Sequence, residues 1–375
     1  LLLALFIPCS VLCLAITVRN LNSDQFALLE FKDRIAGPQN VMANNWTAST
    51  SVCNWIGVSC GILHKRVIAL NLTSMNLRGT IPPHLGNLSF LLSLDLSSNH
   101  FYGHLPKELG HLHRLRILQL SYNRLNGEIP SWLGNLQRVR RLEMKNNNFT
   151  GTIPETLVNM SNLEILNLGF NQLSDQVPSS IFNNAPKLEF LFLWGNKLSG
   201  NIPNSISNAS MLKKLELSHN LFSGPIPKTL ANCRHLRKIA VSGNPLSGVL
   251  PTYIGNLSKS FQYFYAHNCE LQGIIPMEIG NLTNLLLLQL GYNKLSGLIR
   301  ASIGGMRNLQ GLFLSSNKLG GPISESLCGL ERLYKMYLGL NKLHGPIPSC
   351  LGNITSLGYL YLNSNRLSSA IPSNL

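Results

Sequence analysis

One sequence frame returns at nearly constant spacing and constrains the fold more than any other feature. From about residue 67 the frame L-x-x-L-x-L-x-x-N-x-L-x-G-x-I-P occurs in thirteen copies, which are 24 residues apart ten times and 25 residues apart twice. Such a period predicts a solenoid, because one repeat cannot bury its apolar face alone and must stack on its neighbours. Met75 and Cys269 replace the frame's Asn in two copies, and the other copies carry Asn99, Asn123, Asn147, Asn171, Asn196, Asn220, Asn244, Asn293, Asn317, Asn341 and Asn365.

Each frame position has a physical role. The L-x-L segment alternates with period two, which predicts a short strand with Leu in the core and x in solvent. Stacked copies then form a long parallel sheet. The Asn amide is expected to turn inward and bond backbone groups of neighbouring turns, which are costly to bury unpaired. Four departures from G-x-I-P predict irregular second strands, namely Asp175 and Ser369 in place of Gly and Arg300 and Ser324 in place of Pro.

The residues before the repeats predict a secreted chain with an N-terminal cap. Residues 1–15 are almost entirely apolar, too short to span a bilayer, and typical of a signal peptide cleaved near Ala15. Cys9 and Cys13 would be removed with it. Asp24 is expected to cap a helix in DQFALLEFKDRI that Gly37-Pro38 ends. The helix's apolar face would consist of Phe26, Leu28, Leu29, Phe31 and Ile35.

The remaining cysteines suggest one disulfide. Cys53 and Cys60 lie seven residues apart beside Trp55, a spacing that suits a bridge closing the end of the core, and no His or second Cys pair supports the alternative of a metal site. Cys233, Cys328 and Cys350 fall at different phases of the repeat and are interpreted as buried free thiols. A bridge between Cys328 and Cys350 is the alternative.

The net charge limits the possible partners of the chain, and its N-glycosylation sequons indicate its cellular compartment. The formal net charge is +15 and the pI about 9.6, which admits nucleic acid, an acidic cell-wall polymer, an anionic membrane or an acidic peptide. No block of basic residues stands out, so a solvated basic face is expected and nucleic acid is not. Nine sequons agree with secretion, and four of them share one repeat phase. They start at Asn45, Asn71, Asn87, Asn148, Asn159, Asn208, Asn256, Asn281 and Asn353.

The outward x positions predict where a partner binds. No metal, cofactor or catalytic constellation is expected, because the His and acidic residues are scattered. Aromatic residues instead occupy solvent-facing strand or strand-edge positions, where the core does not need them. Mutual shielding or cover by glycans is the alternative. These residues are Phe170, Phe190, Phe192 and Trp194 in copies five and six, and Tyr263, Tyr265, Tyr292, Phe313, Tyr337, Tyr359 and Tyr361 in copies nine to thirteen.

A row of cations accompanies the later aromatics. In four consecutive copies the residue after the frame's Asn is a cation, namely Lys294, Lys318, Lys342 and Arg366. We expect them to form a basic ladder beside the tyrosines that favours an acidic peptide. Simple duplication of N-K-L, with no ligand, remains the alternative.

The segments DQFALLEFKDRI, NNWTASTSVCNWIGVSC and RVIALNLTSMNLRGTIPPHLGNLSFL resemble the cap and first repeat of plant leucine-rich-repeat receptor kinases. The subfamily containing the flagellin, elongation-factor and rice bacterial-blight receptors is the nearest match. The resemblance implies an α/β-type solenoid, curved as a right-handed superhelix. It has a parallel sheet on the concave face, short 3-10 or irregular segments on the convex face, and a helical cap. It also implies an extracellular receptor region that binds a peptide or protein, with a leucine-rich-repeat co-receptor kinase as a further partner.

The sequence leaves two functional readings open. No kinase motif is present, so no chemistry is assigned to this chain. We expect residues 1–15 to be the signal, 16–66 the cap and 67–375 the repeats, with the C-terminal cap, membrane segment and kinase lying beyond Leu375. The first reading is a receptor kinase ectodomain in defence signalling. The alternative is a secreted inhibitor of microbial cell-wall enzymes or a receptor-like protein without a kinase.

Overall fold

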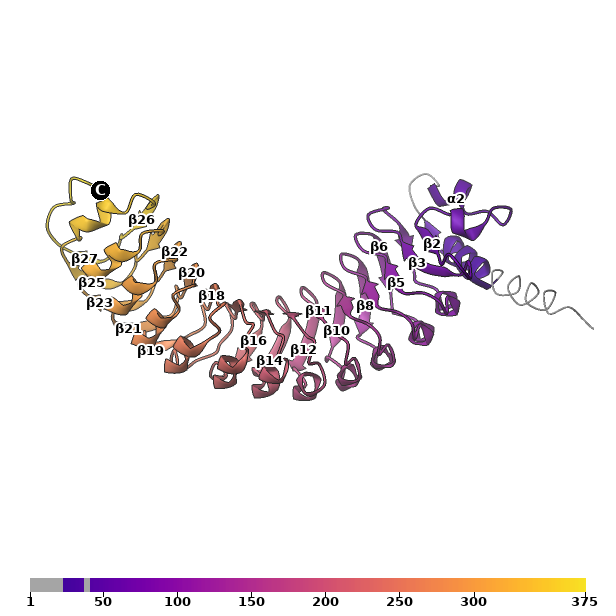
Figure 1. Cartoon of the computed structure of the whole chain (residues 1–375), viewed down its shortest axis with the longest axis horizontal. Coiled ribbons are helices and arrows are strands. Elements are labelled where there is room, and N and C mark those ends of the chain that lie inside the picture. Colours follow the sequence, from indigo (N-terminus) through magenta and orange to yellow (C-terminus); the bar gives the residue numbers. More distant parts are fainter. Residues whose placement is uncertain (1–22, 37–40) are drawn as a thin grey trace, which may run out of the picture. The chain divides into compact units, whose positions relative to one another are not determined.

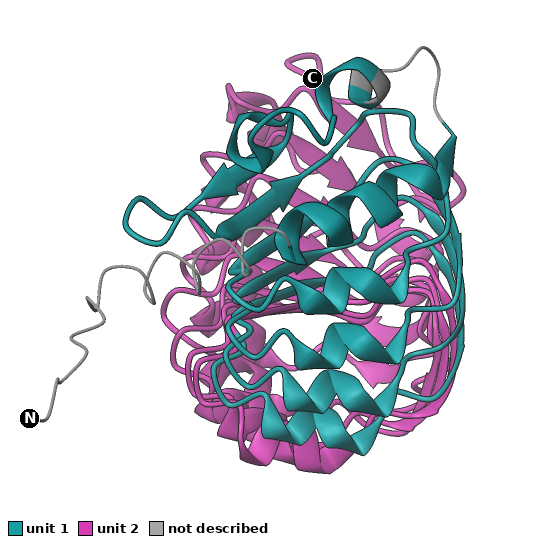
Figure 2. Cartoon of the chain, turned by 90° about the vertical axis from the view of Figure 1, so that its right-hand side faces the viewer, with its two compact units in different colours: residues 1–163 teal, residues 164–375 magenta. Residues whose placement is uncertain are grey.

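The computed structural model describes residues 23–36 and 41–375, so the expected signal segment with Cys9 and Cys13 lies outside the described residues. The chain divides into two compact units, residues 1–163 and 164–375, which Figure 2 shows in different colours. In each unit the L-x-L segments form parallel strands, and short 3-10 segments form a separate row (Figure 1). The repeat fold expected from the sequence is therefore confirmed in each unit.

The N-terminal cap occupies the start of unit 1. Residues 23–33 are helical, and α2 (Val41–Asn45), η2 (Val52–Asn54) and β2 (Val58–Cys60) follow, with β2 antiparallel to β3 (Val67–Asn71). Cys53 and Cys60 are joined by a disulfide. Trp46 and Trp55 are both buried, and their rings stack with centroids 5.2 Å apart.

Three expectations for the cap helix are wrong. Asp24 lies inside the helix, and its carboxylate accepts hydrogen bonds from Arg66 and the Val67 N–H instead of capping the helix. Phe26 is 53% exposed, so it does not belong to the buried face. The helix ends at residue 33, so Ile35 is not on its apolar face but in β1 (Ile35–Ala36), which pairs antiparallel with β4 (Arg78–Gly79). Gly37 and Pro38 lie outside the described residues.

The repeats of unit 1 carry two rows of strands and one row of 3-10 segments. After β3 the L-x-L row continues in parallel with β5 (Ser93–Asp95), β7 (Ile117–Gln119) and β9 (Arg141–Glu143). After β4 the second row continues with β6 (His100–Gly103), β8 (Arg124–Glu128) and β10 (Asn148–Gly151). The 3-10 segments are η3 (Pro83–Asn87), η4 (Lys107–His111), η5 (Ser131–Asn135) and η6 (Glu155–Asn159).

Unit 2 repeats the same plan. Its L-x-L strands are β11 (Ile165–Asn167), β13 (Phe190–Phe192), β15 (Lys214–Glu216), β17 (Lys238–Ala240), β18 (Tyr263–Tyr265), β20 (Leu287–Gln289), β22 (Gly311–Phe313), β24 (Lys335–Tyr337) and β26 (Tyr359–Tyr361). Its 3-10 segments are η7 (Ser179–Asn183), η8 (Asn204–Asn208), η9 (Lys228–Asn232), η10 (Thr252–Asn256), η11 (Met277–Asn281), η12 (Ala301–Gly305), η13 (Glu325–Gly329) and η14 (Ser349–Asn353).

The second strand row of unit 2 is interrupted once. One group contains β12 (Gln172–Gln176), β14 (Lys197–Asn201) and β16 (Leu221–Ser223), and the other contains β19 (Gln272–Ile274), β21 (Lys294–Leu298), β23 (Lys318–Gly321), β25 (Lys342–Gly345) and β27 (Arg366–Leu367). Elsewhere the residue after the frame's Asn can donate to the preceding repeat, as His100 N–H does to Leu77 O and Lys294 N–H to Leu271 O, at 2.7 Å each. Copy eight has Pro245 at this place, which has no N–H to donate and prevents a strand there.

The irregularity expected at the four departures from G-x-I-P lies instead in copy eight, and the expectation is wrong for three of the four copies. The strand that contains Asp175 is five residues long, because Asp175 adopts the left-handed φ of 62° that Gly would take. Arg300 and Ser324 have the extended backbone of the proline that they replace, and regular strands precede both. Of these four copies, only the one with Ser369 has a strand shortened to two residues, β27.

The asparagines of the frame tie neighbouring repeats together. Asn220 is typical: its Oδ1 accepts from Leu198 N–H at 3.1 Å, and its Nδ2 donates to Leu193 O and Leu217 O at 3.0 Å each. Cys269 takes this place in copy nine, where its Sγ donates to Val241 O and His267 O at 3.3 Å each. The thiol takes over the amide's donor function, while the Leu246 N–H donates to Asn244 O at 2.9 Å and the Ser247 N–H to Cys269 O at 3.3 Å.

The interpretation of Cys328 and Cys350 as free thiols is wrong. The two form a disulfide between adjacent repeats, 22 residues apart in sequence. Cys233 and Cys269 are free and buried, and burial raises the pKa of both thiols to about 11. Neither thiol is therefore in the reactive thiolate form near neutral pH.

The sequons follow the repeat more closely than the sequence analysis recognised. Six of the nine asparagines, not four, are the last residue of a 3-10 segment, because Asn159 and Asn353 share this place with the others. Glycans attached there would line the 3-10 row. The six are Asn87, Asn159, Asn208, Asn256, Asn281 and Asn353.

Candidate functional site

The solvent side of the L-x-L strands of unit 2, here called the sheet face, carries most of the predicted aromatic residues. Alternation along these three-residue strands points the central residue into the core and turns the flanking ones outward, as in β18, where Phe264 is buried between Tyr263 and Tyr265. The outward residues of β13, β18, β22, β24 and β26 include Phe190, Phe192, Tyr263, Tyr265, Phe313, Tyr337, Tyr359 and Tyr361.

The other three predicted aromatics follow the strands. Trp194 comes just after β13, while Phe170 and Tyr292 occupy the turn before the frame's Asn with positive φ values of 50° and 54°. Phe170 is 50% and Tyr292 65% exposed. These residues therefore flank the sheet face at the turn edge.

The aromatics of copies five and six pack on one another. The ring centroids of Phe190 and Phe192 lie 6.1 Å apart, those of Phe192 and Trp194 5.8 Å, and those of Phe170 and Trp194 5.9 Å. The Lys214 ammonium lies 5.7 Å from the Phe190 ring. Mutual shielding, the alternative reading of these aromatics, describes this cluster well.

Charged residues missed by the sequence analysis separate this cluster from the later aromatics. Lys213 pairs with Glu189 at 2.7 Å, and Lys238 pairs with Glu216 at 2.6 Å while its ammonium lies 4.8 Å from the Tyr265 ring. Burial, followed by the charges of Tyr263 and Glu216, raises the pKa of Tyr265. These charged residues could have been predicted to lie on the sheet face, because they occupy x positions of the L-x-x-L-x-L segment, as the aromatics do.

The later aromatics form a ridge across adjacent strands. Phe313 and Tyr337 meet edge to face at 4.9 Å, and Tyr337 meets Tyr361 at 4.4 Å. We call these three residues the aromatic ridge. Tyr334 and Tyr359 form a second edge-to-face pair at 5.3 Å beside it. Such pairs hold rings in one orientation without burying them fully.

A hollow lies on each side of the aromatic ridge. The first, the turn-side hollow, has a volume of about 460 Å³ and is lined by the three ridge residues together with His267, Tyr292 and Leu340, among others. The second, the entry-side hollow, has a volume of about 530 Å³ and is lined by Tyr263, Leu287, Phe313, Arg332, Tyr334 and Lys335, among others. Both volumes fall in the range of side-chain and small-ligand pockets.

The predicted basic ladder lies elsewhere. Lys294, Lys318, Lys342 and Arg366 are the first residues of β21, β23, β25 and β27, in the second strand row, and none of them lines either hollow. The cation beside the tyrosines is instead Lys335, whose ammonium lies 5.3 Å from the Tyr359 ring and 5.7 Å from the Tyr334 ring. Lys335 is not among the cations expected there from the sequence.

His267 adds a titratable group to the turn-side hollow. Burial, with a smaller contribution from His219, lowers the pKa of His267 from its ordinary value of 6.5, and a hydrogen bond with Gln289 opposes the shift. Because the folded state resists protonation more than the unfolded state, folding stability is fully present above pH 6.5 and falls as the pH drops below it.

We expect His267→Gln to remove part of this acid sensitivity. The urea midpoint of the variant should fall less between pH 7 and pH 5 than that of the wild type, because one group that takes up a proton on unfolding is gone. The same substitution at exposed His113 is the control. Equal pH dependence of wild type and His267→Gln would contradict this role.

Comparison with known proteins identifies the family. The profile described as "Leucine-rich repeat region" matches residues 59–256, more than half of the chain. The chain belongs to the leucine-rich-repeat proteins. The profiles "Leucine rich repeat N-terminal domain" and "Leucine Rich Repeat" match residues 21–61 and 308–330.

Its curated relatives include plant receptor kinases. The LRR receptor-like serine/threonine-protein kinase EFR of Arabidopsis thaliana is 49% identical over 71 residues, which are 18% of this chain and 7% of that protein. The receptor kinase-like protein Xa21 of Oryza sativa subsp. japonica is 42% identical over 74 residues, again 18% and 7%. The matched stretch is therefore a small part of each relative.

The structural neighbours cover far more of the chain. The crystal structure of PEPR1–AtPEP1 has a TM-score of 0.87 at 35% identity, covering 94% of this chain and 50% of that one. The Arabidopsis receptor kinase HAESA, solved with the peptide hormone IDA and the co-receptor SERK1, has a TM-score of 0.74 at 30% identity, covering 94% and 67%. The fold is thus that of plant receptor ectodomains. Within the described residues, no helix is long and apolar enough to cross a membrane.

Proposed function

We propose that this chain is the extracellular ligand-recognition region of a plant receptor kinase, and that it binds a peptide on the sheet face of copies nine to thirteen. The observation that carries the proposal is the aromatic ridge of Phe313, Tyr337 and Tyr361 with a hollow on each side. Rigid, partly exposed aromatics beside a pocket are typical binding hot spots.

The form of the site favours an extended segment. The ridge crosses β22, β24 and β26, so a chain lying along it would pass over successive strands and place side chains alternately in the two hollows. An apolar side chain suits the turn-side hollow with Tyr292 and Leu340, and an acidic one suits Lys335 and Arg332 in the entry-side hollow. Peptide ligands in neighbours such as HAESA with IDA support this class.

The remaining parts of the proposal rest on the family. The relatives are receptor kinases, which favours a place outside the plasma membrane for this region, a kinase in the same protein, and a leucine-rich-repeat co-receptor kinase as the second partner. A role in defence signalling rests on the sequence resemblance to the receptor kinase subfamily named above. Recognition, not catalysis, is the proposed activity of this chain.

A displayed peptide library panned against the secreted chain tests the proposal. Peptides enriched by the wild type should lose at least about tenfold in affinity for Tyr337→Ala/Tyr361→Ala, because two hot-spot rings of the ridge are removed. The matched control is Tyr102→Ala/Tyr122→Ala, which removes two tyrosines of unit 1 that are 46% and 47% exposed. Affinity should be measured by titration calorimetry.

Two outcomes would reject the proposal. One is equal loss of affinity in the ridge and control variants, which would mean that the peptides bind outside the ridge. The other is failure of the library to enrich any peptide while the chain binds and inhibits a microbial polygalacturonase, which would favour a secreted inhibitor.

A further inference from the structure

The basic ladder of Lys294, Lys318, Lys342 and Arg366 is a built feature that the sheet-face proposal does not use. Each residue is exposed and begins a strand of the parallel group β21, β23, β25 and β27. The register pairs Ser296 with Lys318, Gly320 with Lys342, and His344 with Arg366. Successive cations are therefore offset by two residues and form a slanted row across adjacent strands.

Side chains at this position reach from one repeat to the next. Lys294 Nζ lies 3.0 Å from Glu270 Oε2, the residue at the same place in the preceding copy. The cations at this position in the next three copies are Lys318, Lys342 and Arg366. Within the described residues, none of these three has an acidic partner. Cations on neighbouring strands repel one another. A bound polyanion would relieve this repulsion.

No acidic residue competes for these cations along the same strands. After residue 284 the sequence contains only Glu325 and Glu331 as acids. Glu325 begins η13, and Glu331 lines the entry-side hollow on the sheet face. Lys294 is compensated by Glu270, whereas the second strand row of the last three copies is basic without local compensation, which gives it a positive potential attractive to anions.

An apolar row accompanies the ladder on the same strands. Leu298, Pro322 and Pro346 occupy the x of G-x-I-P and are exposed, and they continue a row of exposed apolar residues that begins with Pro225, Val249 and Ile274 in copies seven to nine. Gln176 and Asn201 stand at this place in copies five and six. Leu298 lies against Gly321, and Pro322 Cβ lies 3.8 Å from where a Cβ on Gly345 would be. Between the two rows lie small or polar residues, namely Ser296, Gly320 and His344.

We propose that this cation-and-apolar surface, the outer ladder, binds a linear polyuronate, a polysaccharide with one carboxylate on each sugar. The copies offer their side chains in the same order: a cation, then a small or polar residue (Ser296, Gly320 or His344), then Leu298, Pro322 or Pro346, with Ala370 in this last place in copy thirteen. The cation would face a carboxylate, the middle residue would leave room for hydroxyls, and the apolar residue would pack on the C–H face of a sugar ring. A polymer with an identical repeating unit suits this regular order, whereas an acidic peptide presents its carboxylates at sequence-dependent places.

Binding of the full secreted chain to immobilised polygalacturonate tests this. We expect Lys318→Gln/Lys342→Gln/Arg366→Gln to weaken binding about tenfold or more, since three of the four cations of the ladder are lost. The matched control is Lys107→Gln/Lys228→Gln/Lys259→Gln, which removes the same charge from exposed lysines elsewhere and should keep affinity within about twofold. Wild-type binding should also weaken as salt rises.

Competition experiments identify the chemical class of the ligand. Soluble polygalacturonate should displace the chain, while fully methyl-esterified pectin, polyglutamate and phosphatidylserine vesicles should not at equal charge or sugar concentration. Equal loss of binding in both triple variants would overturn the proposal in favour of net charge alone. Equal competition by polyglutamate or by the vesicles would overturn the assignment to a polyuronate. Circular dichroism of each variant checks that folding is unchanged.

Discussion

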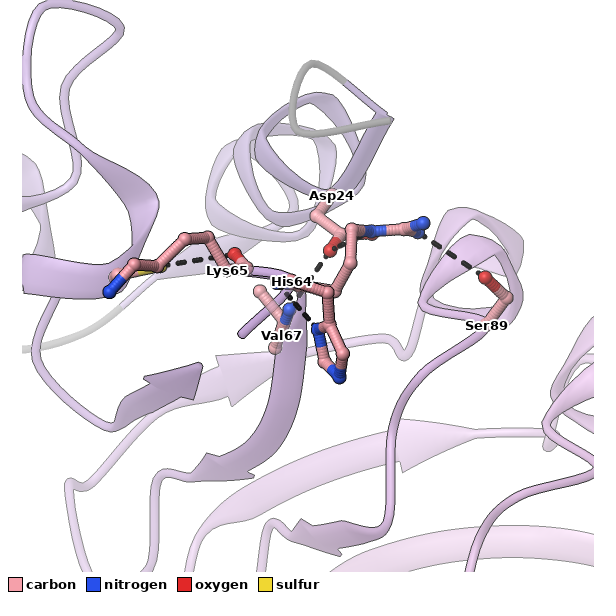
Figure 3. Close-up of polar contacts among 7 residues, drawn as sticks. Asp24, His64, Lys65, Val67 and Ser89 are labelled. Atoms are coloured by element: carbon pink, nitrogen blue, oxygen red, sulfur yellow. Dashed lines mark hydrogen bonds and ion pairs between the residues drawn. The ribbon is translucent and has the colours of Figure 1, made fainter. Parts of the chain in front are cut away.

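Replacing Asp24 by Asn is expected to lower the free energy of unfolding of the cap by about 3–5 kcal/mol, the cost of removing one partner from a buried ion pair. Asp24 is 0% and Arg66 6% exposed. The carboxylate accepts from Arg66 Nε at 2.8 Å and Nη2 at 2.7 Å, and from Val67 N–H at 2.9 Å (Figure 3). The neutral amide would leave the Arg66 cation buried without a counter-charge.

The effect should be local to the cap and first repeat. The pair joins the cap helix to the start of β3, and Arg66 also reaches Ser89 Oγ at 3.3 Å and lies 4.7 Å from the Phe90 ring. Losing it should release the helix first, because terminal repeats open before the interior of a solenoid. Urea unfolding followed by hydrogen exchange of residues 24–33 measures both the size and the place of the change.

Glu270→Gln provides the matched control, because it removes one carboxylate from the exposed Lys294–Glu270 pair, whose side chains are 53% and 52% exposed. An exposed pair contributes little, so the change should stay below about 1 kcal/mol. Similar losses in both variants, or faster exchange throughout the chain for Asp24→Asn, would contradict the role assigned to Asp24.

The repeat frame predicts the backbone well because every position in it serves the same contact in each copy. The strands begin and end where the Leu, Asn and Gly positions place them, and Cys269 substitutes for Asn as its small donor group suggests. The frame fails to predict the strands where a single residue removes a backbone hydrogen-bonding group. Pro245 removes an N–H and interrupts the strand row, whereas Asp175 and Arg300 keep the required dihedrals and change nothing.

The candidate site was predicted less completely, because position in the frame does not give neighbours in space. The aromatics were found from their outward positions, but the two hollows depend on how Phe313, Tyr337 and Tyr361 tilt against one another. Lys294 and Lys318 were placed beside the tyrosines, since they follow the strands in sequence. The turn at the frame's Asn carries them onto the second strand row instead.

The disulfide between Cys328 and Cys350 also could not be predicted from the positions of the two residues in the frame. Cys328 lies near the end of η13 and Cys350 near the start of η14, so their phases in the frame differ. Adjacent 3-10 segments nevertheless place the two Cα atoms 5.7 Å apart, within the usual range for a disulfide. Sequence phase alone does not reveal this proximity.

Asn220→Ala is expected to destabilise unit 2 by about 3 kcal/mol, because it leaves the Leu198 N–H and the Leu193 and Leu217 carbonyl oxygens buried with fewer partners. Asn220 is 5% exposed, so water cannot easily replace the amide. Asn220→Cys should recover part of this loss, as the thiol of Cys269 donates to two carbonyl oxygens in copy nine. Urea unfolding at constant pH measures all three proteins.

Asn284→Ala is the control, because the exposed Asn284 side chain also bonds a carbonyl oxygen of the preceding repeat, Lys259 O at 2.8 Å. Solvent can take over that bond, so the loss should be below about 1 kcal/mol. If Asn220→Ala and Asn284→Ala shift the urea midpoint equally, burial of the asparagine does not determine how much its hydrogen bonds contribute to the free energy of unfolding. If Asn220→Cys is no more stable than Asn220→Ala, the Sγ contacts of Cys269 contribute nothing, and copy nine is held by its neighbours alone.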